Sequence, residues 1–303
     1  MLFAGHDTFH IREGWIHKGL RLVREKADIF AEENATDYFG IGKNMVTALR
    51  YWLGAANLID PQKGRSTSSR KGCSSNRFTL SPLGELIYGY DPYIEEDSTL
   101  WILHYNLAIN KERATTWYWF FNKFPLSRFE SVTALNYLAR WVESSSRGKT
   151  VKITSLQKDI SCLARTYTKN PQRNRDDNPE DTFECPLSSL RLLDYLPNSD
   201  SFKINLGARE IPPAVMAYAT TKFIKTTNEK STETSLKELS SGDSSPGRVF
   251  VLSQESLLEN VEKMLAAFPK DFHFTRTAGL NTVRIVSTDK DPLSFLKVSY
   301  KRL

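Results

Sequence analysis

The chain has 303 residues, of which 40% are hydrophobic and 12% aromatic. This content excludes a disordered protein, because disordered chains lack the apolar side chains that a core needs. The length allows two or three compact units, and the formal net charge of +6 is compatible with a polyanionic partner without requiring one.

Membrane and disulfide classes are not indicated either. There is no run of eighteen apolar residues, and residues 1–9 lack the basic start and apolar stretch of a signal peptide. We therefore expect a cytoplasmic protein with no membrane contact. Cys73, Cys162 and Cys185 are odd in number and show no CxxC spacing, so neither a disulfide framework nor a structural zinc site is predicted.

The first ninety or so residues follow the order of a winged helix-turn-helix. Apolar spacing predicts an amphipathic helix over 11–25, a short helix over 33–39 and a longer helix over 43–58. A glycine turn at 40–42 separates the last two, as in a helix-turn-helix. A Ser- and Gly-rich segment follows and leads into a strand-like stretch at 77–80, which predicts a hairpin wing.

Short helices with brief strand-like stretches recur along the rest of the chain. Residues 99–124 are dense in aromatic side chains, and polar stretches at 144–149 and 226–235 are candidate linkers. We therefore predict a mainly α fold with small β-hairpins (α+β), built from tandem winged helix-turn-helix-like units. The predicted domains are 1–128, which includes an aromatic-rich helical extension, then 129–228 and 229–303.

One side of the predicted helix over 43–58 is small, polar and basic. Residues near the start of a recognition helix reach base edges in the major groove, where Asn can read adenine and Arg can read guanine. The candidate base- and phosphate-contacting residues here are Lys43, Asn44, Thr47 and Arg50. Arg12 and Lys18, from the preceding segment, are further candidate DNA contacts.

The segment after this helix carries five basic residues and no acidic one. A wing of that composition can lie along phosphates and add salt-dependent affinity. These residues are Lys63, Arg65, Arg70, Lys71 and Arg77. Charge and topology together favour binding of double-stranded DNA; the alternative is a winged helix that makes protein contacts beside a disordered basic loop.

A candidate site for phosphodiester cleavage lies near the N-terminus, since cleavage with Mg²⁺ needs carboxylates around the ion and a group that activates water. If this stretch is helical, His6, His10 and Glu13 share one face. Asp7 lies at the edge of that face. We therefore expect His6, Asp7 and Glu13 to be catalytic, with Asp7 and Glu13 as metal ligands. The alternative is that Asp7 or Thr8 caps a helix and His6 is bonded within the fold.

Two other groups are candidates for the same chemistry. Five carboxylates within nine residues could gather a hard cation: Asp176, Asp177, Glu180, Asp181 and Glu184. Of these, Asp176, Asp177 and Asp181 are the weaker metal-ligand candidates, and a solvated loop is the alternative.

His104, near Asp97 and Asn106, is a further catalytic candidate inside the aromatic block. The aromatic side chains could stack on an unpaired base, although their helical spacing favours a core and a hydrogen-bonded core histidine. No P-loop, HNH or PD-(D/E)xK pattern is present, so no common nuclease motif supports catalysis.

Several stretches carry a resemblance to a known family. They are GHDTF at 5–9, REGW at 12–15, GIGKNMV at 40–46, RYW at 50–52, TLWILHY at 99–105, WY at 117–118, FN at 121–122 and TAGL at 277–280. Together they span nearly the full chain and resemble the bacterial domain-of-unknown-function family 4007.

The resemblance implies the DNA-nicking component of the Ssp single-strand DNA phosphorothioate modification system, which belongs to an anti-phage defence. It also implies Mg²⁺, with Mn²⁺ as an alternative ion, and ATPase and sulfurtransferase-like partner components. We therefore expect a DNA-binding, metal-dependent DNA-nicking endonuclease. A non-enzymatic DNA-binding adaptor and a transcriptional regulator of the same operon are the alternatives.

Overall fold

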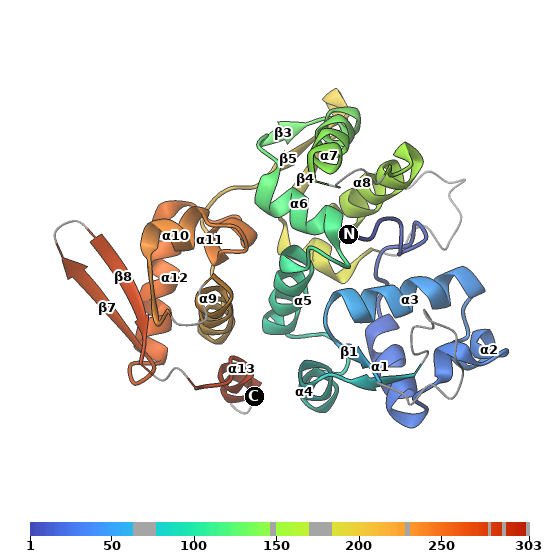
Figure 1. The fold of residues 1–303 in the computed structure, drawn as a ribbon, viewed down its shortest axis with the longest axis horizontal. Coiled ribbons are helices and arrows are strands. Elements are labelled where there is room, and N and C mark those ends of the chain that lie inside the picture. Colours follow the sequence, from blue (N-terminus) through green and yellow to red (C-terminus); the bar gives the residue numbers. More distant parts are fainter. Residues whose placement is uncertain are drawn as a thin grey trace.

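A computed structural model describes residues 1–62, 77–145, 150–169, 184–227, 231–277, 280–286 and 289–300. In this part of the chain, helices carry most of the mass and small antiparallel sheets lie at the periphery (Figure 1). This agrees with the predicted α+β class. No helix in the described ranges is both long enough and apolar enough to cross a membrane.

The N-terminal elements follow the predicted order. They are α1 (Trp15–Glu25), η1 (Ile29–Ala31), α2 (Ala35–Phe39), α3 (Lys43–Ala55), β1 (Ile59–Pro61), β2 (Phe78–Leu80) and α4 (Pro82–Tyr90). Strands β1 and β2 pair antiparallel, with Ile59 opposite Leu80. The Phe78 amide also donates to the carbonyl of Ala27 at 2.7 Å, so the chain just after α1 lies beside β2 and is joined to this two-stranded sheet by a backbone hydrogen bond.

The predicted bounds of these helices need correction. The helix expected from residue 11 begins at Trp15, because Gly14 adopts a left-handed conformation (φ 74°) that cannot continue a right-handed helix. The longer helix expected to reach residue 58 ends at Ala55. The turn between α2 and α3 is confirmed, since Gly40 takes the left-handed conformation that ends α2 (φ 57°).

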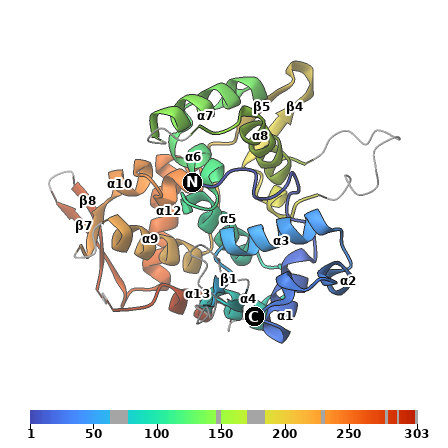
Figure 2. The ribbon, with the colours of Figure 1, turned by 45° about the vertical axis from the view of Figure 1, so that its right-hand side comes forward.

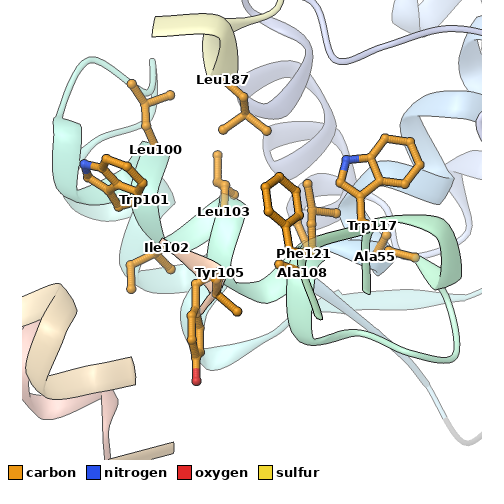
Figure 3. Close-up of a cluster of buried hydrophobic side chains, with 14 of the residues drawn as sticks. Ala55, Leu100, Trp101, Ile102, Leu103, Tyr105, Ala108, Trp117, Phe121 and Leu187 are labelled. Carbon is orange, nitrogen blue, oxygen red and sulfur yellow. The ribbon is translucent and has the colours of Figure 1, made fainter. Parts of the chain in front are cut away.

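The aromatic block forms two central helices, α5 (Asp97–Ile109) and α6 (Thr115–Lys123). Every residue of α5 from Ser98 to Ala108 is buried, so this helix lacks a solvent face. Figure 3 shows Leu103 of α5 and Phe121 of α6 near Leu187, which comes from a later segment. The aromatic side chains are therefore core residues that connect distant parts of the sequence.

The next elements form a second small sheet. They are β3 (Arg128–Phe129), α7 (Ser131–Ser145), α8 (Ile153–Tyr167), η3 (Pro186–Leu190), β4 (Leu193–Leu196), η4 (Pro197–Ser199) and β5 (Ser201–Ile204). Strand β5 lies between β3 and β4, and both pairings are antiparallel.

The last elements form a third sheet with the same arrangement. They are α9 (Pro213–Thr227), β6 (Glu233–Ser235), α10 (Leu236–Ser241), α11 (Pro246–Val249), α12 (Gln254–Ala267), β7 (Phe272–Thr277), β8 (Leu280–Ile285) and α13 (Leu293–Tyr300). Strand β8 lies between β6 and β7. Ser235 and Glu238 form a reciprocal capping box that fixes the start of α10.

The C-terminal helix returns to the centre of the molecule. Helix α13 contacts α9 and α4, and the Tyr300 hydroxyl bonds the Thr99 hydroxyl of α5 at 2.5 Å. The buried hydrophobic side chains, from Ile11 to Tyr300, form one continuous cluster. The three sheets are thus attached to a common core.

Candidate nucleic-acid interface

Helix α3 presents two different faces. Its buried side, which includes Leu49, Trp52 and Leu53, packs into the core. Its other side carries the predicted DNA-contacting residues: Lys43, Asn44 and Thr47 are exposed and Arg50 is half-buried. The helix therefore holds a short row of polar and basic side chains toward solvent, starting at its first turn.

A hollow of about 480 Å³ runs beside this face. Its lining comes from α3, the β1–β2 strands, the N-terminal segment and the α5–α6 connection: Leu2, Gly5, Thr47, Arg50, Tyr51, Gly54, Pro61, Phe78 and Arg113. The two ionised groups in this lining are the guanidiniums of Arg50 and Arg113, and no lining residue among those described is acidic. An anion such as a phosphate would find two cations and no opposing carboxylate here.

Two glycines allow the walls of this hollow to lie close together. A Cβ atom added at Gly5 would lie 2.4 Å from Cδ2 of Tyr51, and one added at Gly54 would lie 2.7 Å from Nη1 of Arg113. The N-terminal segment and the Arg113 side chain can approach α3 only because these two positions lack a side chain.

The N-terminal segment before the predicted helix is an irregular turn. Ala4, Asp7 and Thr8 all have positive φ angles, of 53°, 46° and 75°. The prediction that His6, His10 and Glu13 share a helical face is therefore wrong, because these dihedrals exclude a right-handed helix. Residues other than glycine keep positive φ angles only where surrounding contacts hold the backbone in that conformation.

Asp159 of α8 supplies those contacts. Its carboxylate, 2% exposed, accepts hydrogen bonds from the Ala4 amide (2.7 Å), from Nε2 of His6 (2.8 Å) and from the Thr116 hydroxyl (2.5 Å). The Thr8 amide donates to Nδ1 of His6 at 3.1 Å, so Nε2 carries the proton that His6 donates to Asp159. His6 is fully buried, and the hydrogen bonds of its two ring nitrogens hold the turn in place. This agrees with the alternative interpretation, in which His6 is bonded within the fold.

The other proposed metal ligands do not gather around a common point. Asp7 is half-buried in the turn, and Glu13 is exposed ahead of α1. Among the described residues, no group of three or more His, Cys, Asp or Glu side chains could hold a metal ion. Asp176, Asp177 and Asp181 lie outside the described residues, as does most of the acidic run.

His104 is bonded on both ring nitrogens inside the core. Nδ1 lies 2.8 Å from the Tyr167 hydroxyl and Nε2 lies 2.8 Å from the Val249 carbonyl oxygen. The pKa of this imidazole is lowered to about 4, mainly by burial and to a smaller extent by the charge of Arg209, against the opposing hydrogen bond to Val249. A neutral, enclosed ring of this kind joins α5 to α8 and α11, and it has no open nitrogen for a substrate.

The remaining basic candidates have mixed positions. Lys18 donates to the Phe39 carbonyl at 2.8 Å and so helps to end α2. The Arg12 guanidinium lies 5.6 Å from the ring centroids of both Phe9 and Trp15. Arg77 is exposed beside β2, bonded to Gln62 at 3.3 Å. Lys63, Arg65, Arg70 and Lys71 lie outside the described residues.

Asp159 and Arg113 are site residues that the sequence interpretation missed. Asp159 lies between Leu156 and Leu163 on the apolar stripe of its helix, and a carboxylate on such a stripe is a signal of a buried polar partner. Arg113 gives no local signal, because only the tertiary packing of the α5–α6 connection against Gly54 brings it to α3.

Comparisons with known proteins show the family of this chain and the similarity of its fold to solved structures. A model of a protein family of unknown function, DUF4007, matches residues 3–300. A solved structure described as an SspB crystal structure is 29% identical, with a TM-score of 0.87, and the match covers 99% of this chain and 88% of that chain. A second, described as magnesium ion-bound SspB, is 28% identical with the same TM-score and coverage. No curated protein matches.

Proposed function

Since this chain belongs to the DUF4007 family, we propose that it is an SspB-like protein that binds double-stranded DNA and nicks it in a Mg²⁺-dependent reaction. In this proposal the nick serves phosphorothioate modification in anti-phage defence, together with ATPase and sulfurtransferase-like components. The similarity to SspB over 99% of the chain supports the system, and the magnesium ion bound to one SspB structure supports the ion.

The observation that carries DNA binding is the α3 face with its adjoining hollow. Exposed Lys43, Asn44 and Thr47 lead into a depression that holds Arg50 and Arg113 and no described carboxylate. Phosphate contacts of this kind position a protein on a duplex, and Asn or Arg near the start of the helix can then reach base edges.

The architecture supports three tandem winged-helix units. In a winged helix, a first helix and strand precede two further helices and a two-stranded wing, with the first strand paired to the last. The elements α6, β3, α7, α8, β4 and β5 follow this order, with the sheet ordered β3-β5-β4. The elements α9, β6, α10, α12, β7 and β8 follow it as well, with the sheet ordered β6-β8-β7. In the first unit, the bond from Phe78 to Ala27 takes the place of the first strand.

Nicking rests on the relationship to SspB and not on a visible catalytic group. The described residues contain no group of three or more His, Cys, Asp or Glu side chains that could hold a metal ion, and His6 and His104 are enclosed by hydrogen bonds. Of the two proposed ligands near the N-terminus, Asp7 is half-buried in the turn, two residues after Gly5, which lines the hollow.

The full chain on supercoiled plasmid tests the proposal. With Mg²⁺ or Mn²⁺ we expect conversion to the open-circular form, and with EDTA we expect none. Duplex binding without nicking would exclude the nuclease and favour the non-enzymatic adaptor. If the wild type nicks DNA, we expect Asp7→Asn to lose nicking and keep its affinity for the duplex. If the folded chain fails to bind duplex DNA at low salt, the DNA-binding proposal itself is wrong.

A further inference from the structure

Helix α8 carries an exposed basic face that the role of α3 does not explain. Lys158 and Arg165 are exposed on the helix, Lys152 is exposed at its N-cap, and Lys169 is exposed just after it. The helix contains a single carboxylate, Asp159, which points into the core and is 2% exposed. Among the residues of α8 itself, all of which are described, the exposed charges are therefore cationic.

The N-terminal turn couples α8 to α3. On the α8 side, Asp159 bonds Ala4 and His6, and Nη2 of Arg165 donates to the Thr8 carbonyl at 2.9 Å. On the α3 side, Gly5 closes onto Tyr51. Figures 1 and 2 both show the N-terminal segment passing between α3 and α8. The two helices are thus held in a fixed relation by one short, strained turn.

The third unit provides an internal comparison. Helix α12 has the same place in its sheet topology as α8 has in the second unit. Its exposed positions include Glu255, Glu259 and Glu262, with Lys263 as the one exposed cation of the helix. The exposed face of α12 would repel a phosphate backbone. A cationic face is therefore a property of α8 and does not follow from its place in the sheet topology.

We infer that α8 is a second duplex-contacting helix, whose Lys152 and Lys158 neutralise phosphates of the same DNA molecule that α3 binds. This inference rests on the proposed DNA binding by α3 and adds the second contact. The N-terminus of α8 favours it as well, because Lys152 leaves the first amides of the helix without a side-chain cap and these amides attract anions.

The test measures affinity of the full chain for a duplex at several salt concentrations. Each phosphate contact lowers log K by about 0.9 per unit of log salt concentration. The double variant Lys152→Gln/Lys158→Gln should reduce that slope by about 1.8 and weaken binding about 60-fold at 0.1 M salt. Arg165 is left intact because its bond to Thr8 also holds the turn.

The matched control is Lys270→Gln/Lys297→Gln, which removes the same charge from exposed positions after α12 and on α13. It should retain the wild-type slope, and melting temperatures should show that both variants fold. Hydroxyl-radical footprints should lose protected backbone positions only in the α8 variant.

The outcomes separate the two proposals. If wild-type protein binds no duplex, or Arg50→Gln leaves binding unchanged, the proposed function of α3 fails. If Arg50→Gln weakens binding while the α8 variant matches the Lys270/Lys297 control in slope and footprint, the second contact is wrong and the α3 site stands.

Discussion

The N-terminal turn depends on the carboxylate of Asp159. Asp159→Ala would leave the Ala4 amide, His6 and the Thr116 hydroxyl without their acceptor in a buried place. We expect the free energy of unfolding to fall by about 3–5 kcal/mol, because each buried donor left without an acceptor costs about 1–3 kcal/mol. Denaturant unfolding measures this loss.

Hydrogen exchange provides the local check on the same variant. The Thr8 amide, which donates to His6, should lose protection more than amides in α12 do. Asp159→Asn, which keeps one acceptor oxygen, should be intermediate. A loss under 1 kcal/mol for Asp159→Ala would show that the turn does not depend on this carboxylate.

The buried imidazole of His104 predicts a pH dependence of stability. Its pKa in the folded protein is about 4, below the value near 6.5 of an unfolded chain. Between these values the unfolded state binds more protons, so its contribution is present above about pH 6.5 and is lost as the pH falls toward about 4. The loss is about 3 kcal/mol at most.

His104→Gln isolates that contribution. The variant is expected to be less stable at pH 7, because it loses the bonds to Tyr167 and Val249. Its unfolding free energy should nevertheless decline less steeply than that of the wild type between pH 6.5 and pH 4. Parallel declines in the two proteins would contradict a neutral His104.

At the scale of single elements, α3 allows stability and binding to be separated. Gly54→Ala places a methyl group 2.7 Å from Nη1 of Arg113, and the flexible guanidinium must move away. Alanine also has the higher helix propensity, by about 1 kcal/mol. We therefore expect unchanged or higher thermal stability together with weaker binding to duplex DNA.

Arg113→Gln is the companion variant for this prediction. It should weaken binding to a similar extent as Gly54→Ala, and the double variant should add little, because both changes act through the same guanidinium. Additive losses in the two variants would mean that Arg113 is not the group that Gly54 accommodates.

Some of the helices and strands are determined by local sequence signals and others by distant residues. The period of apolar residues and the Gly40 turn were sufficient to predict α2 and α3, and the stretch at 77–80 predicted β2. Strand β1 was not predicted. The start of α1 was misplaced because a helical period continued through Ile11, and only the left-handed Gly14 interrupts it. The turn before it was not predictable locally, since Asp159, some 150 residues away, holds it.

Site residues differ in the same way. Lys43, Asn44 and Thr47 could be named because one helix and its solvent face determine them. The hollow beside them could not, since it needs Gly5 and Arg113 from segments that only tertiary packing brings to α3. The interpretation of His6 as a catalyst assumed a helix that the backbone does not form.

For the whole molecule, the continuous core bears on whether the predicted domains 1–128, 129–228 and 229–303 unfold separately. His104 of α5 bonds Tyr167 and Val249, which belong to the second and third predicted domains. Thr99 bonds Tyr300 near the end of the chain. These contacts lie within the single hydrophobic cluster, so we expect the parts to unfold together.

Tryptophan fluorescence tests this cooperativity sharply. All six tryptophans lie between Trp15 and Trp141, and the ring of one of them, Trp101, lies 5.4 Å from the ring of Phe250 in the third predicted domain. Far-ultraviolet circular dichroism also follows α9, α12 and α13. One cooperative unit should give coincident denaturation curves by both probes. A separately unfolding segment over 229–303 would give a dichroism transition displaced from the main fluorescence transition, and the shared core would then not couple the third unit to the rest.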